Sequence, residues 1–254
     1  MDFLSVSLLP HRSSMPSLKL YYHPVSPPAR TCLWAIHANG SVNDVELCFV
    51  DISKGETRTP EFLAMNPYHT VPCLKDEETG LILTESAAIL MYLADKLNWT
   101  TVTVPNAKED PIAFYKLMNY FNFHHEHTRV LCHDIMKPYC APVFVSGAQP
   151  NFEAARAGIA KAEEWLVHFD KMLEQNGGYV AGNKPTVGDI FAHCEFAMYL
   201  PGERGLNVYD FSKFANIQKW IKDVQTNVPE YEKANEGLVG FVGYAKGLCG
   251  EFQC

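Results

Sequence analysis

The sequence contains no CxxC motif, that is, no two cysteines separated by two other residues, although it has eight cysteines among its 254 residues. They are widely scattered: Cys32, Cys48, Cys73, Cys132, Cys140, Cys194, Cys249 and Cys254. This spacing excludes a zinc knuckle and disfavours a dithiol redox centre. A chain of this length can bury a large core and needs no disulfides to fold. We therefore expect reduced, mostly buried thiols in a cytoplasmic protein.

The sequence also lacks an excess of positive charge and long apolar segments. Its formal net charge is −8, so nucleic acid would find no electrostatic attraction. The longest uncharged apolar stretches are well short of the roughly 20 residues that a membrane-spanning helix requires. We therefore expect neither nucleic acid nor a membrane as a partner. The composition, with 47% hydrophobic and 20% charged residues, is that of an ordinary globular protein.

Residues 1–17 precede the first periodic pattern of the chain. They contain a short apolar patch, but Asp2 stands where a secretory signal would carry a basic region. Two interpretations stay open, a flexible extension and a Ser-rich organelle-targeting segment. Because these residues carry no periodic apolar face, we expect that their deletion leaves activity unchanged.

Residues 18–98 show alternating strand and helix patterns. Apolar residues alternate along Leu18–Tyr22 as in a strand, and Pro27 and Pro28 after Ser26 are typical of a helix start. That helix is expected to stop at Gly40. Further elements are predicted as a strand at 45–51, a short helix at 59–65, a hairpin of strands at 72–75 and 80–84, and a helix at 85–98. The order β-α-β-α-β-β-α predicts an α+β, thioredoxin-like domain.

Strand patterns stop beyond Pro105, and the remaining sequence predicts an all-α bundle. In Phe152–Asn176, apolar residues alternate spacings of four and three, as on one face of a helix. Thr186 and Asp189 have the spacing of a capping box, so we assign Asp189 a structural role. These patterns divide the chain into an extension at 1–17, a thioredoxin-like domain at 18–98, a linker at 99–107 and a helical domain at 108–254.

Three segments carry a resemblance to a known family. They are LYYHPVSPPAR at 20–30, NPYHTVPCL at 66–74 and LTESAAILMYLADK at 83–96. In this order, on the predicted strands and helices, they make the chain resemble the cytosolic glutathione transferases over about residues 18–247, and most of all the theta and delta classes. The first segment contains the S-x-P-x-R pattern of the serine-type classes.

The resemblance implies an enzyme that conjugates the thiolate of reduced glutathione to hydrophobic electrophiles, as in detoxification. Glutathione would be a cosubstrate, and an electrophile would bind in the helical domain. The resemblance also implies a homodimer, with the helix from Glu85 and a long helix from about Lys108 at the interface. It leaves the physiological electrophile open.

Ser26 is our candidate for the catalytic hydroxyl. The pKa of a free thiol is near 8.5, so a nucleophile at neutral pH requires stabilisation of its thiolate. At a strand-to-helix junction, a hydroxyl and the first N–H groups of the helix can point at one anion. Taken alone, Ser26 would be an ordinary N-cap. Tyr22 is the alternative, because the tyrosine-type classes place their hydroxyl at the end of the first strand.

The other two segments supply the expected glutathione-binding residues, which together with Ser26 are His69, Thr70, Val71, Pro72, Glu85 and Ser86. The resemblance implies a cis Val71–Pro72 bond whose valine backbone pairs with the cysteinyl backbone of glutathione. Glu85 and Ser86 open a helix, which suits the γ-glutamyl group.

The residues that would bind the glycyl carboxylate of glutathione depart from the family pattern. Delta-class enzymes have a histidine where this chain has Thr57. Two residues remain as sources of positive charge, Lys54 and Arg58.

The run of histidines at 124–127 suggests a metal site at first sight. However, no third and fourth ligands follow at a diagnostic spacing, and the HExxH pattern is absent. We therefore expect no metal. The resemblance instead implies that His124 and Thr128 form walls of the second-substrate site, with Phe241 closing it together with Tyr244.

Two other functions remain as alternatives. One is a glutathione-dependent thiol transferase, peroxidase or isomerase, although reductases of this kind usually have cysteine in place of Ser26, and Cys32 lies six residues later. The other is a non-catalytic protein of the same fold that binds a hydrophobic ligand.

Overall fold

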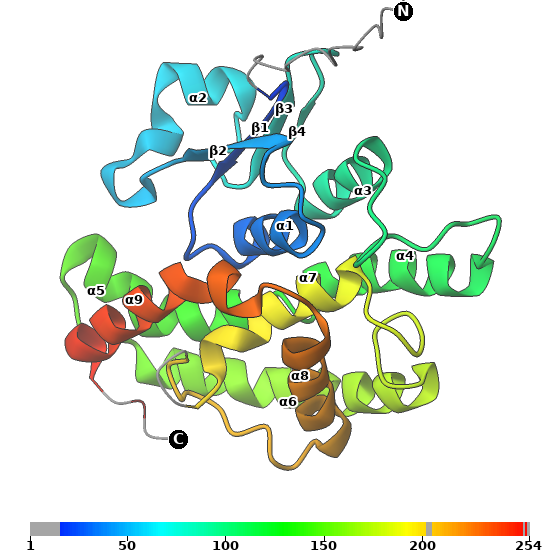
Figure 1. Ribbon diagram of the computed structural model, residues 1–254. Coiled ribbons are helices and arrows are strands. Elements are labelled where there is room, and N and C mark those ends of the chain that lie inside the picture. The colour runs from blue at the N-terminus through cyan, green and yellow to red at the C-terminus, as the bar shows by residue number, and fades with distance from the viewer. Residues whose placement is uncertain (1–15, 202–204, 251, 253–254) are drawn as a thin grey trace, which may run out of the picture.

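The computed structural model describes residues 16–201, 205–250 and 252. The four strands and helices α1–α3 form one half of the molecule, and helices α4–α9 form the other (Figure 1). Residues 1–15, which make up most of the predicted N-terminal extension, lie outside the described residues. The predicted order of elements, a thioredoxin-like half followed by an all-helical half, is confirmed.

The sheet has the strand order β2-β1-β3-β4. Its strands are β1 (Leu18–Tyr22), β2 (Val45–Phe49), β3 (Cys73–Asp76) and β4 (Ile82–Leu83). β1 pairs parallel with β2 and antiparallel with β3, and β3 pairs antiparallel with β4. The last strand is shorter than predicted because Gly80, at φ 73°, still belongs to the turn. The N–H of Leu81 also donates to the Thr79 hydroxyl at 3.2 Å rather than to a strand.

Three helices accompany the sheet. They are α1 (Pro27–Ala38), α2 (Pro60–Met65) and α3 (Ser86–Lys96), with short 3-10 turns at Ile52–Lys54 and Glu56–Arg58. The Thr59 hydroxyl caps α2 by accepting from the N–H of Phe62 at 3.3 Å. Ile89, Leu90 and Leu93 of α3 are fully buried, as their spacing predicts.

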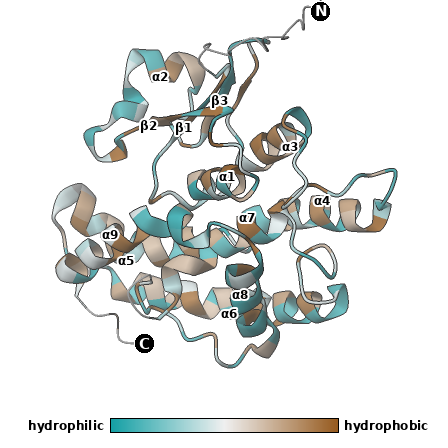
Figure 2. Cartoon of the chain, viewed as in Figure 1, coloured by the Kyte–Doolittle hydropathy of each residue, from teal (hydrophilic) through white to brown (hydrophobic). Residues whose placement is uncertain are grey.

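The helical half contains the remaining elements: α4 (Pro111–Glu126), a π-helical segment η3 (Leu131–Met136), α5 (Lys137–Ser146), α6 (Phe152–Asn176), α7 (Val187–Phe196), a 3-10 turn η4 (Ala197–Tyr199), α8 (Ala215–Asn227) and α9 (Tyr231–Cys249). α6 begins and ends at the predicted residues. α7 lies at the centre, since all ten of its residues are buried, and Figure 2 colours it largely as hydrophobic.

The capping box at the start of α7 is confirmed. The Asp189 carboxylate accepts from the N–H of Thr186 at 2.8 Å and of Val180 at 2.9 Å, and from the Trp220 indole at 2.9 Å. Burial raises the pKa of Asp189, and these hydrogen bonds act to lower it. Asp189 therefore ties α7 to α8 and has the structural role that the spacing predicts.

The two halves meet along α1, which packs against α7 and α9 (Figure 1). The Trp34 indole donates to the Pro229 carbonyl at 2.7 Å, and its ring contacts Tyr231. The segment at 99–107 is also packed, because the Asn39 amide donates to the Val102 carbonyl at 2.9 Å. None of the described helices is both long and apolar enough to cross a membrane.

Candidate functional site

Ser26 occupies the N-cap position of α1, with φ −68° and ψ 118°, but its side chain makes no cap hydrogen bond. The sequence explains this, because Pro27 and Pro28 remove two of the first N–H groups that a cap would bind. The hydroxyl donates instead to the Val71 carbonyl, at 3.4 Å. The same prolines leave Ala29 as the first residue of α1 that has an N–H group.

The segment before β3 lies opposite Ser26. The Val71–Pro72 bond is cis, as predicted. The Asn66 side chain holds the turn in place by donating to the Thr70 carbonyl at 2.9 Å and hydroxyl at 3.1 Å. His69 is exposed and has φ 48°.

The start of α3 forms another side of the site. Glu85 is the N-cap residue, is exposed, and makes no cap hydrogen bond with its side chain. Ser86, the first helical residue, is buried. Because neither Glu85 nor the first N–H groups of α3 are used by a cap, both are available to a charged ligand.

A cavity of about 190 Å³ joins these segments to the helical half. Its lining consists of Pro28, Thr70, Val71, Pro72, Thr84, Glu85, Ser86, His124, His125, Arg129 and Phe191. Six of our candidate residues therefore meet at one cavity: Thr70, Val71, Pro72, Glu85, Ser86 and His124. Ser26 adjoins the cavity through its contact with Val71.

His124 is 3% exposed and contributes a wall rather than a free base. Its Nδ1 lies 3.4 Å from the Tyr120 hydroxyl, its Nε2 lies 3.7 Å from Glu195 Oε1, and Phe191 covers its ring at 4.0 Å. Burial, followed by the charges of Arg129 and His125, holds the pKa of His124 well below its ordinary value. The imidazole is thus neutral near pH 7, and both of its nitrogens face protein atoms.

Arg129 and Glu195 form an ion pair at the base of the cavity, with Nη1 2.6 Å from Oε1. Burial acts to lower the pKa of Arg129, but the charge and hydrogen bond of Glu195, together with Cys132 and Tyr199, raise it. Sequence reasoning missed this pair. Arg129 belongs to no recognisable motif. Glu195 occupies a position of α7 that the helical spacing predicts only to be buried.

Five candidate residues lie away from the cavity lining: His69, Thr128, Phe241, Tyr244 and Tyr22. Thr128 is fully buried behind it, where its Oγ1 accepts from the Tyr120 hydroxyl at 3.2 Å. Phe241 belongs to α9 and packs against Phe144 of α5, with the two ring centroids 5.5 Å apart. Tyr22 is half-buried at the end of β1, and burial, then Cys48, raises the pKa of its hydroxyl.

The two candidates for the glycyl carboxylate differ in their surroundings. The Lys54 ammonium already pairs with Asp51 at 3.0 Å. Arg58 is exposed. Thr57, which stands where delta-class enzymes have histidine, is buried. Within the described part of the chain, no group of three or more His, Cys, Asp or Glu side chains is placed to hold a metal ion.

Comparison with known proteins identifies both halves of the chain. Residues 16–95 match the family model of the glutathione S-transferase N-terminal domain, and residues 127–226 match that of the C-terminal domain. Glutathione S-transferase D7 of Drosophila melanogaster is 28% identical over 228 residues, which cover 88% of this chain and 91% of the relative.

Solved structures agree with this assignment. A delta-class glutathione transferase of Nilaparvata lugens is 30% identical, with a TM-score of 0.71 over 91% of this chain and 99% of its own. A human theta-class glutathione transferase, solved with the glutathione conjugate of 1-menaphthyl sulfate, is 26% identical, with a TM-score of 0.75 over 91% of each chain. The chain therefore belongs to the glutathione S-transferase family, a family of transferases.

Proposed function

We propose that this protein conjugates the thiolate of reduced glutathione to hydrophobic electrophiles and that Ser26 activates the thiol. One observation carries the proposal: the Ser26 hydroxyl has no capping role and points across the site to Val71. A long hydrogen bond of 3.4 Å is easily exchanged for a shorter, charge-assisted bond to a sulfur anion. Tyr22, whose pKa is raised, is the alternative donor.

The segments around the cavity suit the three parts of glutathione. The exposed backbone beside the cis proline, with His69 and Thr70 on its approach, would pair with the cysteinyl portion. Glu85 would bind the γ-glutamyl amino group, and Ser86 with the start of α3 would bind its carboxylate. For the glycyl carboxylate we favour Arg58, because Lys54 is already paired with Asp51.

The reaction requires only positioning and stabilisation of the anion. The thiol loses its proton to solvent, and the Ser26 hydroxyl donates to the thiolate. The sulfur then attacks the electrophilic carbon, so a carbon–sulfur bond forms as the bond to the leaving group breaks. The leaving group departs with the electron pair of that bond.

The electrophile would lie against the helical half. His124 offers a neutral ring there, held by Phe191 on one side and by Tyr120 and Thr128 behind it. Phe241 would close the site from α9. The human theta-class relative holds a glutathione conjugate with an aromatic group, which agrees with an apolar second site.

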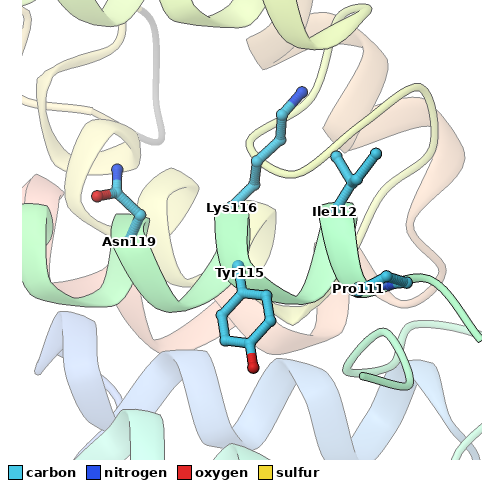
Figure 3. Close-up of a pocket in the computed structure, with 5 residues that line it drawn as sticks. All are labelled: Pro111, Ile112, Tyr115, Lys116 and Asn119. Carbon is cyan, nitrogen blue, oxygen red and sulfur yellow. The ribbon is translucent and has the colours of Figure 1, made fainter. Parts of the chain in front are cut away.

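A homodimer is the assembly that we infer. Ile112 and Tyr115 of α4 are 70% and 66% exposed, which is unusual for large apolar side chains in a row on one helix. They line a groove of about 480 Å³ together with Pro111, Lys116 and Asn119 (Figure 3). Burial of this face against a second copy would remove the exposed Ile112 and Tyr115 side chains from water. The proposed role of the dimer is detoxification in the cytoplasm.

An assay of conjugation tests the proposal. The purified protein should form a thioether from reduced glutathione and a generic aromatic halide, with release of halide. If it reduced a mixed disulfide or a hydroperoxide, or isomerised a substrate, while forming no thioether, it would belong to the alternative class of glutathione-dependent enzymes. Binding of a hydrophobic ligand without any turnover would make it a carrier.

A further inference from the structure

Arg30 is an unusual residue for the interior of a protein, since its side chain is fully buried. It belongs to the first turns of α1 and follows Ser26 by four positions. A buried cation is costly unless hydrogen bonds and a counter-charge compensate it. The contacts of Arg30 therefore indicate its role in the structure.

The guanidinium joins the loop that carries Ser26 to the helical half. Nη1 donates to the Val25 carbonyl at 3.1 Å, and Nη2 donates to the Cys194 carbonyl of α7 at 2.5 Å. The neighbouring Glu195 supplies negative charge. Burial raises the pKa of Glu195, and Arg129 and then Arg30 act to lower it. A carbonyl and the negative charge of α7 thus offset part of the cost of the buried cation, whose Nε has no hydrogen-bond partner among the described residues.

The first of these contacts fixes the peptide that precedes Ser26. Its carbonyl, that of Val25, is held by Arg30. Its N–H, that of Ser26, donates to the His23 carbonyl at 3.1 Å. A peptide unit is planar, so bonds at both of its ends restrict its orientation and, with Ser26 at φ −68°, the direction of the Ser26 Cα–Cβ bond.

We propose that Arg30 is the positioning residue of the active site, and that it anchors the Val25–Ser26 peptide to α7 so that the Ser26 hydroxyl points at the sulfur of bound glutathione. The inference rests on the proposed function. It assigns Arg30 no contact with substrate. It also explains why Arg30, a residue of the N-terminal half, donates its second hydrogen bond to a carbonyl of the helical half.

Substitution of Arg30 tests the proposal. Lysine is shorter than arginine and has one nitrogen in place of the planar guanidinium. Arg30→Lys therefore keeps the charge but can donate to one of the two carbonyls, of Val25 and Cys194, at best. Turnover at neutral pH should fall about tenfold or more through misplacement of the hydroxyl. The pH at half-maximal rate should rise, and the KM for glutathione should stay within a few-fold. Arg30→Met should show the same changes to a larger extent.

A second change separates positioning from mere stability. Asn216→Ala removes the hydrogen bond of 2.8 Å to Asp170 that joins α8 to α6, and neither residue belongs to the cavity lining, so it should lower the Tm without moving the pH profile. In the double variant with Ser26→Ala, Arg30→Lys should slow turnover no further, because the group that it positions is gone. Additive losses, or a lower Tm with an unchanged profile, would overturn the proposal.

Amide hydrogen exchange decides the matter without any turnover. Arg30→Lys should accelerate exchange of the Ser26 amide and leave that of Leu166, in the middle of α6, unchanged. Unchanged protection of Ser26 would contradict the inference whether or not the protein is active. If the unmodified protein forms no conjugate, the proposed function fails separately, and the exchange experiment still tests the role of Arg30.

Discussion

The Ser26 hydroxyl lies 3.4 Å from the Val71 carbonyl oxygen, so the start of α1 and the cis-proline turn face each other across 45 residues of sequence. A serine at a helix start ordinarily binds an N–H of its own helix. Here Pro27 and Pro28 remove two of the first N–H groups, the side chain makes no cap hydrogen bond, and the hydroxyl remains available at the site.

Glu85→Ala should weaken glutathione binding more than it slows the chemical step. The carboxylate is exposed at the start of α3, remote from the sulfur, so its contact is nearly equal in the ground and transition states. We expect the KM for glutathione to rise while kcat changes little. A collapse of kcat at unchanged KM, in steady-state kinetics, would show that the assigned role is wrong.

Tyr115→Glu should shift the protein from dimer to monomer. An aromatic side chain that becomes buried at an interface typically contributes about 2 kcal/mol or more, which is roughly a thirtyfold change in Kd. Sedimentation analysis at several concentrations measures the change. Leu248→Glu provides the matched control, since it places the same charge at an exposed apolar position of α9. Equal masses for the Tyr115 variant and the unmodified protein would argue against α4 as the interface.

His193→Phe should remove part of the loss of stability in acid. His193 is fully buried among Trp34, Trp220 and Tyr231, and its ring nitrogens have no hydrogen-bond partner among the described residues. Burial, then Arg30, lowers the pKa of His193 to about 3. The unfolded chain, with a pKa near 6.5, binds the proton first, so stability decreases as pH falls from about 6.5 towards 3.

The size of this effect is about 1.4 kcal/mol per pH unit in that window. Between pH 7 and pH 5, the unmodified protein should therefore lose roughly 2 kcal/mol more than the variant. Denaturant unfolding at both pH values measures the difference. His168→Gln, at an exposed position of α6, serves as the control and should retain the full loss. If the free energy of unfolding of His193→Phe decreased between pH 7 and pH 5 as much as that of the unmodified protein, the assignment would be refuted.

Gly237→Ala should reduce both stability and turnover. A Cβ at this position of α9 would lie 2.4 Å from Pro24 Cβ, in the loop before Ser26. Overpacking of this kind typically costs about 1–3 kcal/mol. Gly240→Ala is the matched control on the same helix, because nothing lies within 4 Å of its added carbon, and it should stabilise by up to about 1 kcal/mol. If the two variants behaved alike, the packing of α9 on the loop would be unimportant.

The sequence predicts the fold well where local patterns carry it. The alternation at Leu18–Tyr22, the long apolar face of Phe152–Asn176 and the capping box at Thr186 all match the structure. The boundaries of β4 and the π-helical turn at Leu131–Met136 were not predictable in this way. β4 follows a tight turn at Gly80, and the π-helical segment approaches α6 so closely that a Cβ at Gly158 would lie 2.2 Å from the Asp134 carbonyl oxygen. No short sequence pattern contains these contacts.

The candidate site divides similarly. Motifs located Val71, Pro72 and Glu85, which line the cavity, since the roles proposed for them depend on residue types at fixed places in one segment. Arg129 and Glu195 escaped notice because they meet from positions 66 residues apart. The assistance of helix N–H groups to Ser26 stays a prediction, which Pro27 and Pro28 restrict to the N–H groups from Ala29 onwards.

The pH dependence of Ser26→Ala tests the central claim most directly. If Ser26 donates to the thiolate, its loss should cost about 1.5–3 kcal/mol, the value of a hydrogen bond to a charged group. Conjugation at neutral pH should fall roughly ten- to a hundredfold. The deficit should shrink as pH approaches the pKa of the free thiol, and Tyr22→Phe should have the smaller effect. Full activity of Ser26→Ala at neutral pH, with loss of activity in Tyr22→Phe, would contradict the account and assign thiol activation to the tyrosine.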